Sequence, residues 1–200
     1  MSQAAVAHHG VEPAESPLTP ESWGKLGMWV FLAADAMSFG GLLATYGALR
    51  YYDPTWPVPS SILGINTTAF MTFLLIITSM TMVQSLAAIR QGDQVGLRKY
   101  LFFTVAGGAL FLVLQYFEWT HLIAEGQSIQ RNNFGATFFL TTGFHGCHVF
   151  SGVCYLSWIL MRAMAGKYTA DDNNEVEIAA LYWHFVDLIW ILVFTFIYLM

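Results

Sequence analysis

Apolar residues dominate five long stretches of the chain, and polar or proline-rich segments separate them. A helix needs about 20 predominantly apolar residues to cross the hydrocarbon core of a bilayer. Each stretch has that length, and each contains at most one Asp, Glu, Lys or Arg. The pattern therefore predicts an all-α integral membrane protein whose five helices form a bundle and span about 29–49, 62–89, 100–124, 134–161 and 178–200.

The remaining segments are too short and too polar to form a further domain. Three prolines in 51–61 (YYDPTWPVPSS) end the first helix. Residues 1–24 have neither the cationic start nor the apolar core of a cleavable signal peptide. We expect them to form a disordered cytoplasmic tail in front of a single membrane domain, 25–200.

Composition supports a membrane environment and sets an orientation. Hydrophobic residues make up 56% of the chain and charged residues 10%, whereas a soluble domain has about 25% charged residues. Positively charged loops stay in the cytoplasm. One side carries Lys25, Arg90, Arg98, Lys99, Arg162 and Lys167, and the other carries Arg50 and Arg131. This asymmetry predicts a cytoplasmic N-terminus and a periplasmic C-terminus, and so few cations exclude a nucleic-acid partner.

Small and weakly polar residues mark the surfaces where helices are expected to meet. Gly40, Ala44 and Ala48 recur every four residues in the first span, and such stripes allow close backbone approach in lipid. Glycines also punctuate the fourth span, at Gly143, Gly146 and Gly152. In the second span we expect inter-helix hydrogen bonds from Asn66, Thr67, Thr72, Thr78, Ser79, Thr81, Gln84 and Ser85.

Ionisable residues inside spans are costly in lipid and are candidates for function. The candidates are Asp35, Glu118, His121, His145, His148, His184 and Asp187. Helical spacing places three pairs on shared faces: His145 with His148, Glu118 with His121, and His184 with Asp187.

Three interpretations of these residues remain open from the pattern alone. His148 and His184 could ligate a haem. A di-iron bundle needs two Glu-x-x-His runs, and this chain has only one. The acids and histidines could form a proton path, although the carboxylates do not form a continuous row from one side of the membrane to the other. Finally, the groups could hydrogen-bond across helices and specify the packing of the bundle.

Several segments resemble subunit III of haem-copper oxidases. The most specific are TGFHGCHVFSG (142–152) and YWHFVDLIWILVFTFIYLM (182–200). QYFEW (115–119) with HLIAEGQSI (121–129), and WVFLAADAMSFGG (29–41), are similar to two further segments of that family. The likeness extends from about Lys25 to Met200, in the short five-helix bacterial form.

The resemblance implies an accessory subunit of a proton-pumping respiratory terminal oxidase in the bacterial cytoplasmic membrane. Such a subunit packs against catalytic subunit I, alongside subunit II, and holds no metal of its own, since the haems and copper lie in those partner subunits. It supports proton uptake and stability while oxygen is reduced to water. Membrane phospholipid and a larger respiratory supercomplex are further partners that the resemblance allows.

The resemblance also assigns roles to residues. Asp35 takes the place of a buried glutamate that most members carry, and it is shorter by one methylene. His145 and His148 belong to a signature not known for metal binding, so with Glu118, His121, His184 and Asp187 they are expected to form a structural polar network. A lipid contact is expected near Trp56, and no residue is expected to be catalytic.

Two other functions remain open at this point. The short form and the FTFIYLM ending (194–200) are also similar to subunit III of quinol-oxidising haem-copper oxidases. A protein of a different class, either a free-standing membrane cytochrome or a proton-linked transporter, could use the same buried groups.

Overall fold

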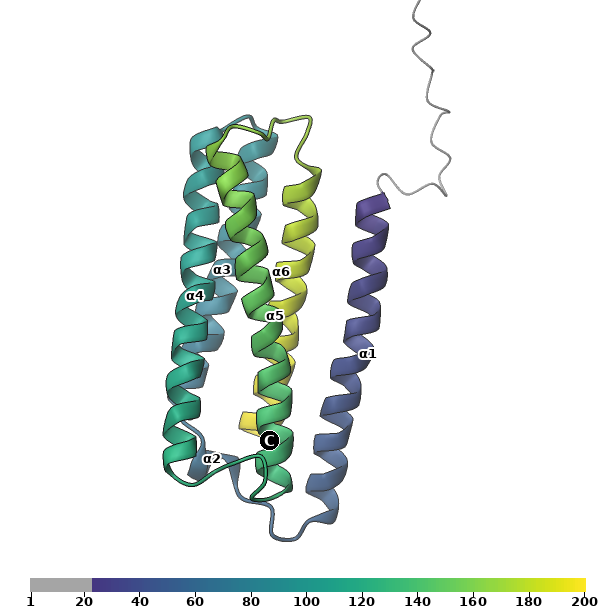
Figure 1. Ribbon diagram of the computed structural model, residues 1–200, viewed down its shortest axis with the longest axis vertical. Helices are drawn as coiled ribbons and strands as arrows, with labels where there is room; N and C mark the ends of the chain where they lie inside the picture. The colour runs from purple at the N-terminus through teal and green to yellow at the C-terminus, as the bar shows by residue number, and fades with distance from the viewer. Residues whose placement is uncertain (1–22) are drawn as a thin grey trace, which may run out of the picture.

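The computed structural model describes residues 23–200, apart from the side chains of Ser60 and Ser61, and this part of the chain is helical without strands. Five of its helices are long and apolar enough to cross a membrane. The elements are α1 (Trp23–Tyr52), α2 (Pro59–Ile62), α3 (Ile65–Arg90), α4 (Gln94–Ala124), α5 (Asn133–Met164), α6 (Asn174–Val193) and its π-helical continuation η1 (Phe194–Leu199) (Figure 1). The predicted all-α, five-span fold is confirmed.

Most of the helices extend beyond the predicted apolar stretches, but α3 begins at Ile65, later than the predicted start at residue 62, because Ile62 ends the separate short helix α2. α1 begins at Trp23, so only residues 1–22 of the predicted tail lie outside the described residues. The polar connections supply caps that prolong the helices: Asp93 Oδ1 accepts hydrogen bonds from the backbone amides of Val95 and Gly96, which are 3.0 and 2.9 Å away. Such caps satisfy amides that would otherwise lack partners at a helix start, so a helix can extend past its apolar residues.

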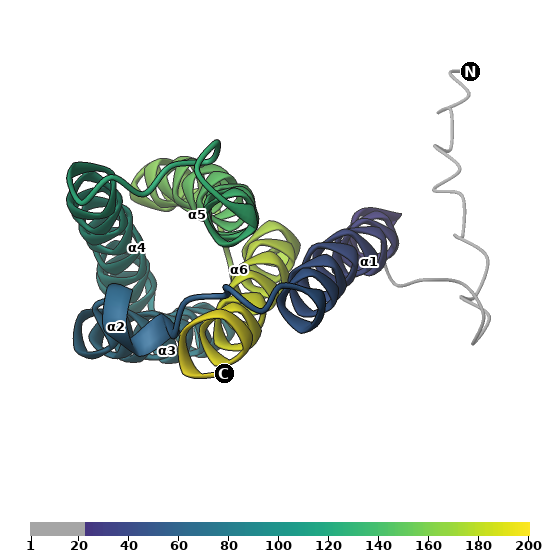
Figure 2. The same cartoon turned by 90° about the horizontal axis from the view of Figure 1, so that it is seen from below.

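Four helices, α3 to α6, form a ring, and α1 lies outside it (Figure 2). α1 packs mainly against α5 and α6. Short loops join α3 to α4 and α5 to α6 at the end where α1 begins, whereas α1 ends at the opposite face, beside η1. Because α1 lies outside the ring, most of its packing is against α5 and α6.

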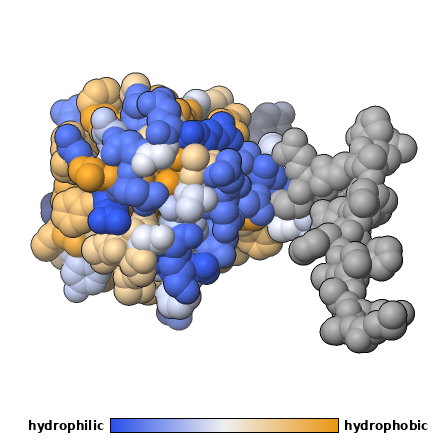
Figure 3. Space-filling view, turned by 90° about the horizontal axis from the view of Figure 1, so that it is seen from above, coloured by the Kyte–Doolittle hydropathy of each residue, from blue (hydrophilic) through white to orange (hydrophobic). Residues whose placement is uncertain are grey.

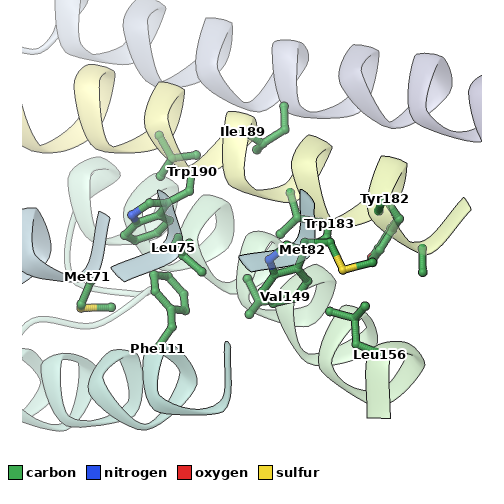
Figure 4. Packing of buried hydrophobic residues seen from close by; sticks show 14 of the residues in the cluster. Met71, Leu75, Met82, Phe111, Val149, Leu156, Tyr182, Trp183, Ile189 and Trp190 are labelled. Atoms are coloured by element: carbon green, nitrogen blue, oxygen red, sulfur yellow. The ribbon is translucent and has the colours of Figure 1, made fainter. Parts of the chain in front are cut away.

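The core of the ring is built on two tryptophans of α6 (Figure 4). Trp183 and Trp190 are 1% and 0% exposed. Each indole N–H donates to a threonine of α3, Trp183 to Thr78 at 3.1 Å and Trp190 to Thr72 at 3.0 Å. A tryptophan N–H buried in lipid needs a partner, and the predicted row of hydroxyls on this span provides it.

Glycine makes room for Trp183. A Cβ on Gly152 would lie 3.0 Å from the Trp183 ring, and a Cβ on Gly108 would lie 2.5 Å from it. Gly152 therefore permits the close approach expected of it. By contrast, a Cβ on Gly40 or Gly146 would meet nothing within 4 Å, and Gly40 lies on an exposed face of α1.

Ion pairs bind α1 to the ring at the end where it begins. Glu177 of α6 lies 3.0 Å from Lys25 Nζ of α1 and 3.3 Å from Arg90 Nη2 of α3. Seen from this end, the surface is largely hydrophilic (Figure 3). The sides of the bundle instead expose large apolar residues such as Phe70, Phe73 and Phe150, as expected of a surface solvated by lipid.

Candidate functional site

Asp35 and His148 form a carboxylate–imidazole pair inside the membrane domain. Asp35 projects from α1 and His148 from α5, and Asp35 Oδ2 lies 3.1 Å from His148 Nε2. The two side chains are 8% and 13% exposed. Asp35 lies about 18 Å along α1 from its start, since a helix rises about 1.5 Å per residue, so the pair is near mid-membrane.

The contacts of His148 favour a protonated group within this pair. His148 Nδ1 lies 2.7 Å from the Phe144 carbonyl oxygen, which can only accept, so Nδ1 carries a hydrogen. If the imidazole were neutral, Nε2 would then present a lone pair to a carboxylate. Either His148 is an imidazolium facing a carboxylate, or Asp35 is a carboxylic acid that donates to His148. In both cases the pair as a whole holds one exchangeable proton.

Aromatic rings surround the pair. The centroid of the His148 ring lies 4.6 Å from that of Phe144 and 5.3 Å from that of Phe39. Phe39 belongs to α1 and is 1% exposed, so it covers the imidazole from the same helix that carries Asp35. Apolar walls strengthen the attraction within the pair, because little solvent screens it.

His145 points to a different helix from His148. It is fully buried, and its Nε2 donates to the carbonyl oxygen of Val186 on α6 at 3.2 Å. The Trp190 and Phe111 rings lie 4.8 and 5.8 Å from its ring centroid. The two histidines of the GFHGCHVFSG segment thus join α5 to α6 and α5 to α1, respectively.

Glu118 lies among hydroxyl groups, and His121 lies apart from it. Tyr198 donates to Glu118 Oε2 at 3.2 Å, and Thr68 Oγ1 lies 3.0 Å from Oε1. These contacts join α4 to η1 and α3. The His121 side chain is 72% exposed, and its Nδ1 lies 3.6 Å from Glu125. The shared face predicted for Glu118 and His121 therefore does not make them partners.

His184 and Asp187 meet through α3 instead of pairing directly. His184 Nδ1 hydrogen-bonds with the hydroxyl of Ser79, which also interacts with the Asp187 carboxyl group. Asp187 is 8% exposed, and its Oδ1 has no hydrogen-bond partner in the described residues. Ser79 was predicted as an inter-helix partner, but its position between these two groups was not.

The histidines do not converge on a ligand set. Within residues 23–200, no three side chains of His, Cys, Asp or Glu are placed together to hold a metal ion. His148 has both ring nitrogens engaged, by Phe144 and Asp35, so it has no free nitrogen for a haem iron. The haem pair considered for His148 and His184 therefore has no geometric support.

Trp56 packs against protein. It lies in the α1–α2 connection, and its ring centroid lies 5.2 Å from Tyr46 of α1 and 5.7 Å from Phe134 of α5. The indole thereby anchors the connection to two helices. Its predicted lipid contact stays a prediction.

Sequence reasoning missed several partners of these polar groups. Thr68 and Tyr198 hold Glu118, and the Phe144 carbonyl sets the hydrogen position on His148. Tyr198 is 80 residues from Glu118, and nothing local in either segment indicates the contact. Only the backbone carbonyl four residues before His148 follows a regular helical spacing.

Five apolar helices with polar groups bridging them define a multi-pass membrane protein. The sequence matches the family model for cytochrome c oxidase subunit III over residues 21–200. It is 37% identical to cytochrome c oxidase subunit 3 of Thermostichus vulcanus, covering 88% of this chain and 86% of that one. It is 35% identical to the probable cytochrome c oxidase subunit 3 of Nocardia farcinica, with 86% of each chain covered.

A quinol oxidase subunit 3 from Bacillus subtilis is 33% identical, covering 88% of this chain and 86% of the relative. The chain therefore belongs to the cytochrome c oxidase subunit III family, and it is a subunit of a haem-copper oxidase complex. The comparisons support the cytochrome c oxidase type over the quinol-oxidising type and over a free-standing cytochrome or transporter.

Proposed function

We propose that this subunit packs on the catalytic subunit of its oxidase and supports proton uptake through the Asp35–His148 pair. The observation that carries the proposal is the 3.1 Å contact between Oδ2 and Nε2, together with the hydrogen fixed on His148 Nδ1. A group that must hold one proton between an acid and a base can accept and release it with little movement.

The shorter acid does not abolish the pair. Asp35 reaches His148 across the α1–α5 contact although it lacks a methylene relative to glutamate. An intramembrane acid that is paired in this way costs less to bury than an isolated one. The shorter side chain thus suits a site where the two helices approach closely.

The wider setting of the chain follows from the same reasoning. The end that carries Lys25, Arg90 and the α5–α6 loop faces the cytoplasm, because positive loops stay inside. We place the protein in the bacterial cytoplasmic membrane beside subunits I and II, with the haems and copper held by those partners. Full use of both His148 nitrogens supports the absence of a redox centre on this chain.

The test compares Asp35→Ala, Asp35→Asn and Asp35→Glu in the intact oxidase complex. We expect Ala and Asn to assemble but to slow turnover at high pH, where protons are scarce, or to shorten the working life of the enzyme. Glu restores an acid and should retain activity. Glu118→Gln is the matched control, since it alters a different intramembrane acid. Wild-type turnover and lifetime at high pH in Asp35→Ala would refute the proposal.

The location of the redox centres has its own test. The complex is purified in mild detergent through a tag at the N-terminus, and a reduced-minus-oxidised visible spectrum is recorded before and after this chain is stripped from its partners. Haem bands should leave with the partners. Haem retained by the stripped chain would make it a cytochrome and overturn the assignment.

A further inference from the structure

Aromatic rings close one side of the Asp35–His148 pair. Phe39 follows Asp35 by one turn on α1, and Phe144 precedes His148 by one turn on α5. The centroids of these two rings are 4.9 Å apart, and Phe39 is 1% exposed. Because α1 and α5 run in opposite directions, both rings lie between the pair and the end where α1 finishes (Figure 1). A phenylalanine ring has no exchangeable hydrogen, so this wall offers a proton no path toward that end.

Hydroxyl groups lie on the opposite side of the pair. Ser151 follows His148 by one turn on α5, toward the end where α1 begins. Its Oγ lies 2.7 Å from Oη of Tyr182, a residue of α6 that is 7% exposed. The Tyr182 ring also reaches α1, because its centroid lies 6.2 Å from that of Phe31, one turn before Asp35. Three helices thus place a pair of hydroxyls on the side of Asp35 and His148 that faces the start of α1.

The two hydroxyls have fewer hydrogens than contacts. Tyr182 Oη lies 3.1 Å and Ser151 Oγ 2.9 Å from the carbonyl oxygen of His148, in addition to the short contact between them. Each hydroxyl has one hydrogen, so at most two of the three contacts are hydrogen bonds at one time. Two bonds that include the short contact form in two ways, with either Ser151 or Tyr182 as the donor between the hydroxyls. A change from one to the other moves hydrogens and leaves the helices in place.

Polar groups continue from the hydroxyls to the surface of the membrane domain. Tyr155 follows Ser151 by one turn on α5, and it interacts electrostatically with Glu175 and Arg162. Arg162 Nη1 lies 2.9 Å from Glu175 Oε1, and the Glu175 side chain is 43% exposed. A series of ionisable and hydroxyl groups therefore extends inward from a water-exposed acid at the end where α1 begins.

We propose that the Asp35–His148 pair exchanges its proton with the end where α1 begins, through the hydroxyls of Tyr182 and Ser151. The inference rests on the proposed function, which gives the pair its proton role and places that end in the cytoplasm. Tyr182 is the hydroxyl next to the pair, since it contacts the His148 carbonyl oxygen and interacts electrostatically with Asp35. His145 also acts electrostatically on His148, but its Nε2 is bound to α6.

The transfer conserves hydrogens at every oxygen. Once the pair has lost its proton, Ser151 Oγ takes a proton from the cytoplasmic side and releases its own hydrogen to Tyr182 Oη. Tyr182 in turn releases its hydrogen to the Asp35 carboxylate, and both hydroxyls end neutral. A hydroxyl suits this step because it can accept and donate at once. The last transfer requires the Asp35 side chain to turn, because its Oδ2 lies against His148 Nε2.

The experiment measures turnover against pH in the intact oxidase complex. Tyr182→Phe keeps the ring against Phe31 but removes the hydroxyl, and it should slow turnover at high pH as much as Asp35→Asn does. Ser151→Ala should slow it less, because the Tyr182 hydroxyl remains, and Ser151→Thr should keep the wild-type rate. In Asp35→Asn/Tyr182→Phe the loss should equal that of Asp35→Asn alone, because residues on one path are not additive.

Two controls match these variants. Tyr198→Phe removes a buried tyrosine hydroxyl that donates to Glu118. Ser157→Ala removes a hydroxyl of α5 that donates to the Val153 carbonyl oxygen, 2.6 Å away. Both should keep the wild-type pH profile. Haem content and melting temperature, measured for every variant, separate a loss of assembly from a loss of proton transfer.

The outcomes separate this inference from the function on which it rests. Wild-type pH profiles in Tyr182→Phe and Ser151→Ala, with slow turnover in Asp35→Asn, would overturn the inference and leave the proposed function intact. A further slowing by Tyr182→Phe in the Asp35→Asn background, as large as in the wild type, would also overturn it, because the hydroxyl would then act independently of the pair. A wild-type profile in Asp35→Asn would refute the proposed function itself, and the inference with it.

Discussion

The intramembrane carboxyl groups of Asp35 and Glu118 have similar surroundings but different partners. Asp35, near mid-membrane, faces an imidazole from α5. Glu118, nearer the end of α4, faces the hydroxyls of Thr68 and Tyr198. A hydroxyl of Ser, Thr or Tyr donates a hydrogen bond but takes up no proton near neutral pH, whereas an imidazole does.

The difference separates a proton-exchanging site from an anchoring one. The Asp35–His148 pair can shift its proton between two groups, and it joins the outer helix α1 to the ring. The Glu118 cluster fastens the end of the chain, η1, to α3 and α4. Similar acids therefore serve different purposes according to what the neighbouring helix presents.

The largest effect should come from breaking the first pair. His148→Leu leaves Asp35 without its imidazole, and removal of one partner from a buried pair costs about 3–5 kcal/mol. We expect lower yield and a lower melting temperature of the purified complex. Asp35→Asn/His148→Leu should recover part of the loss, because no acid then remains to be buried. Wild-type yield and melting temperature in His148→Leu would show that the pair does not support the packing.

A smaller effect should follow at the Glu118 cluster. Tyr198→Phe removes one donor to a carboxyl group, which costs about 1.5–3 kcal/mol for a hydrogen bond to a charged group and less for a neutral one. The melting temperature should fall, while the pH dependence of oxidase turnover should stay that of the wild type. Thr68→Val, which removes the other hydroxyl, should behave alike. A changed pH profile in either variant would mean that Glu118 also exchanges protons.

The smallest effect concerns Tyr168, a tyrosine outside the spans that donates to the carboxylate of Glu175. The Tyr168 hydroxyl donates to Glu175 Oε2 at 2.8 Å, and burial together with this hydrogen bond raises the pKa of Tyr168 above its ordinary value of 10.0. The folded state then binds the phenol proton more tightly than the unfolded state. This contribution to stability is complete below pH 10 and is lost as the pH rises above it.

Tyr168→Phe should therefore flatten the alkaline fall in stability and leave turnover unchanged. Melting temperatures of the two complexes at neutral and at alkaline pH provide the measurement. Tyr52→Phe, at an exposed tyrosine of α1 far from Glu175 in the sequence, is the control. A parallel alkaline fall in Tyr168→Phe and wild type would mean that other groups govern the alkaline limit.

Much of the architecture followed from local sequence properties. Apolar length predicted the number and position of the spans, and the helices depart from it mainly at their ends, where caps such as Asp93 extend them. Hydroxyls of the second span were expected to bridge helices, and Thr72, Thr78 and Ser79 do so. The small residues were predicted less well, since Gly152 packs closely but Gly40 faces outward.

The pairing of the polar groups could not be predicted in the same way. Spacing along one helix placed Glu118 beside His121 and His184 beside Asp187. The structure instead links each acid to residues on other helices, as with Asp35 and His148 or Glu118 and Tyr198. Spacing along a helix shows which side chains lie on the same face of that helix, but it does not show which other helix packs against that face.

The sequence by itself determined that the protein lies in a membrane, where its five spans are, and which ionisable side chains need a partner inside the bilayer. These properties are local, because the cost of burial depends on each residue and on the length of its apolar stretch. Only the tertiary structure decided that α1 lies outside the ring, that Asp35 meets His148, and that Glu118 meets Tyr198. Those features depend on the rotation and contact of helices distant in sequence, which packing of the whole bundle determines.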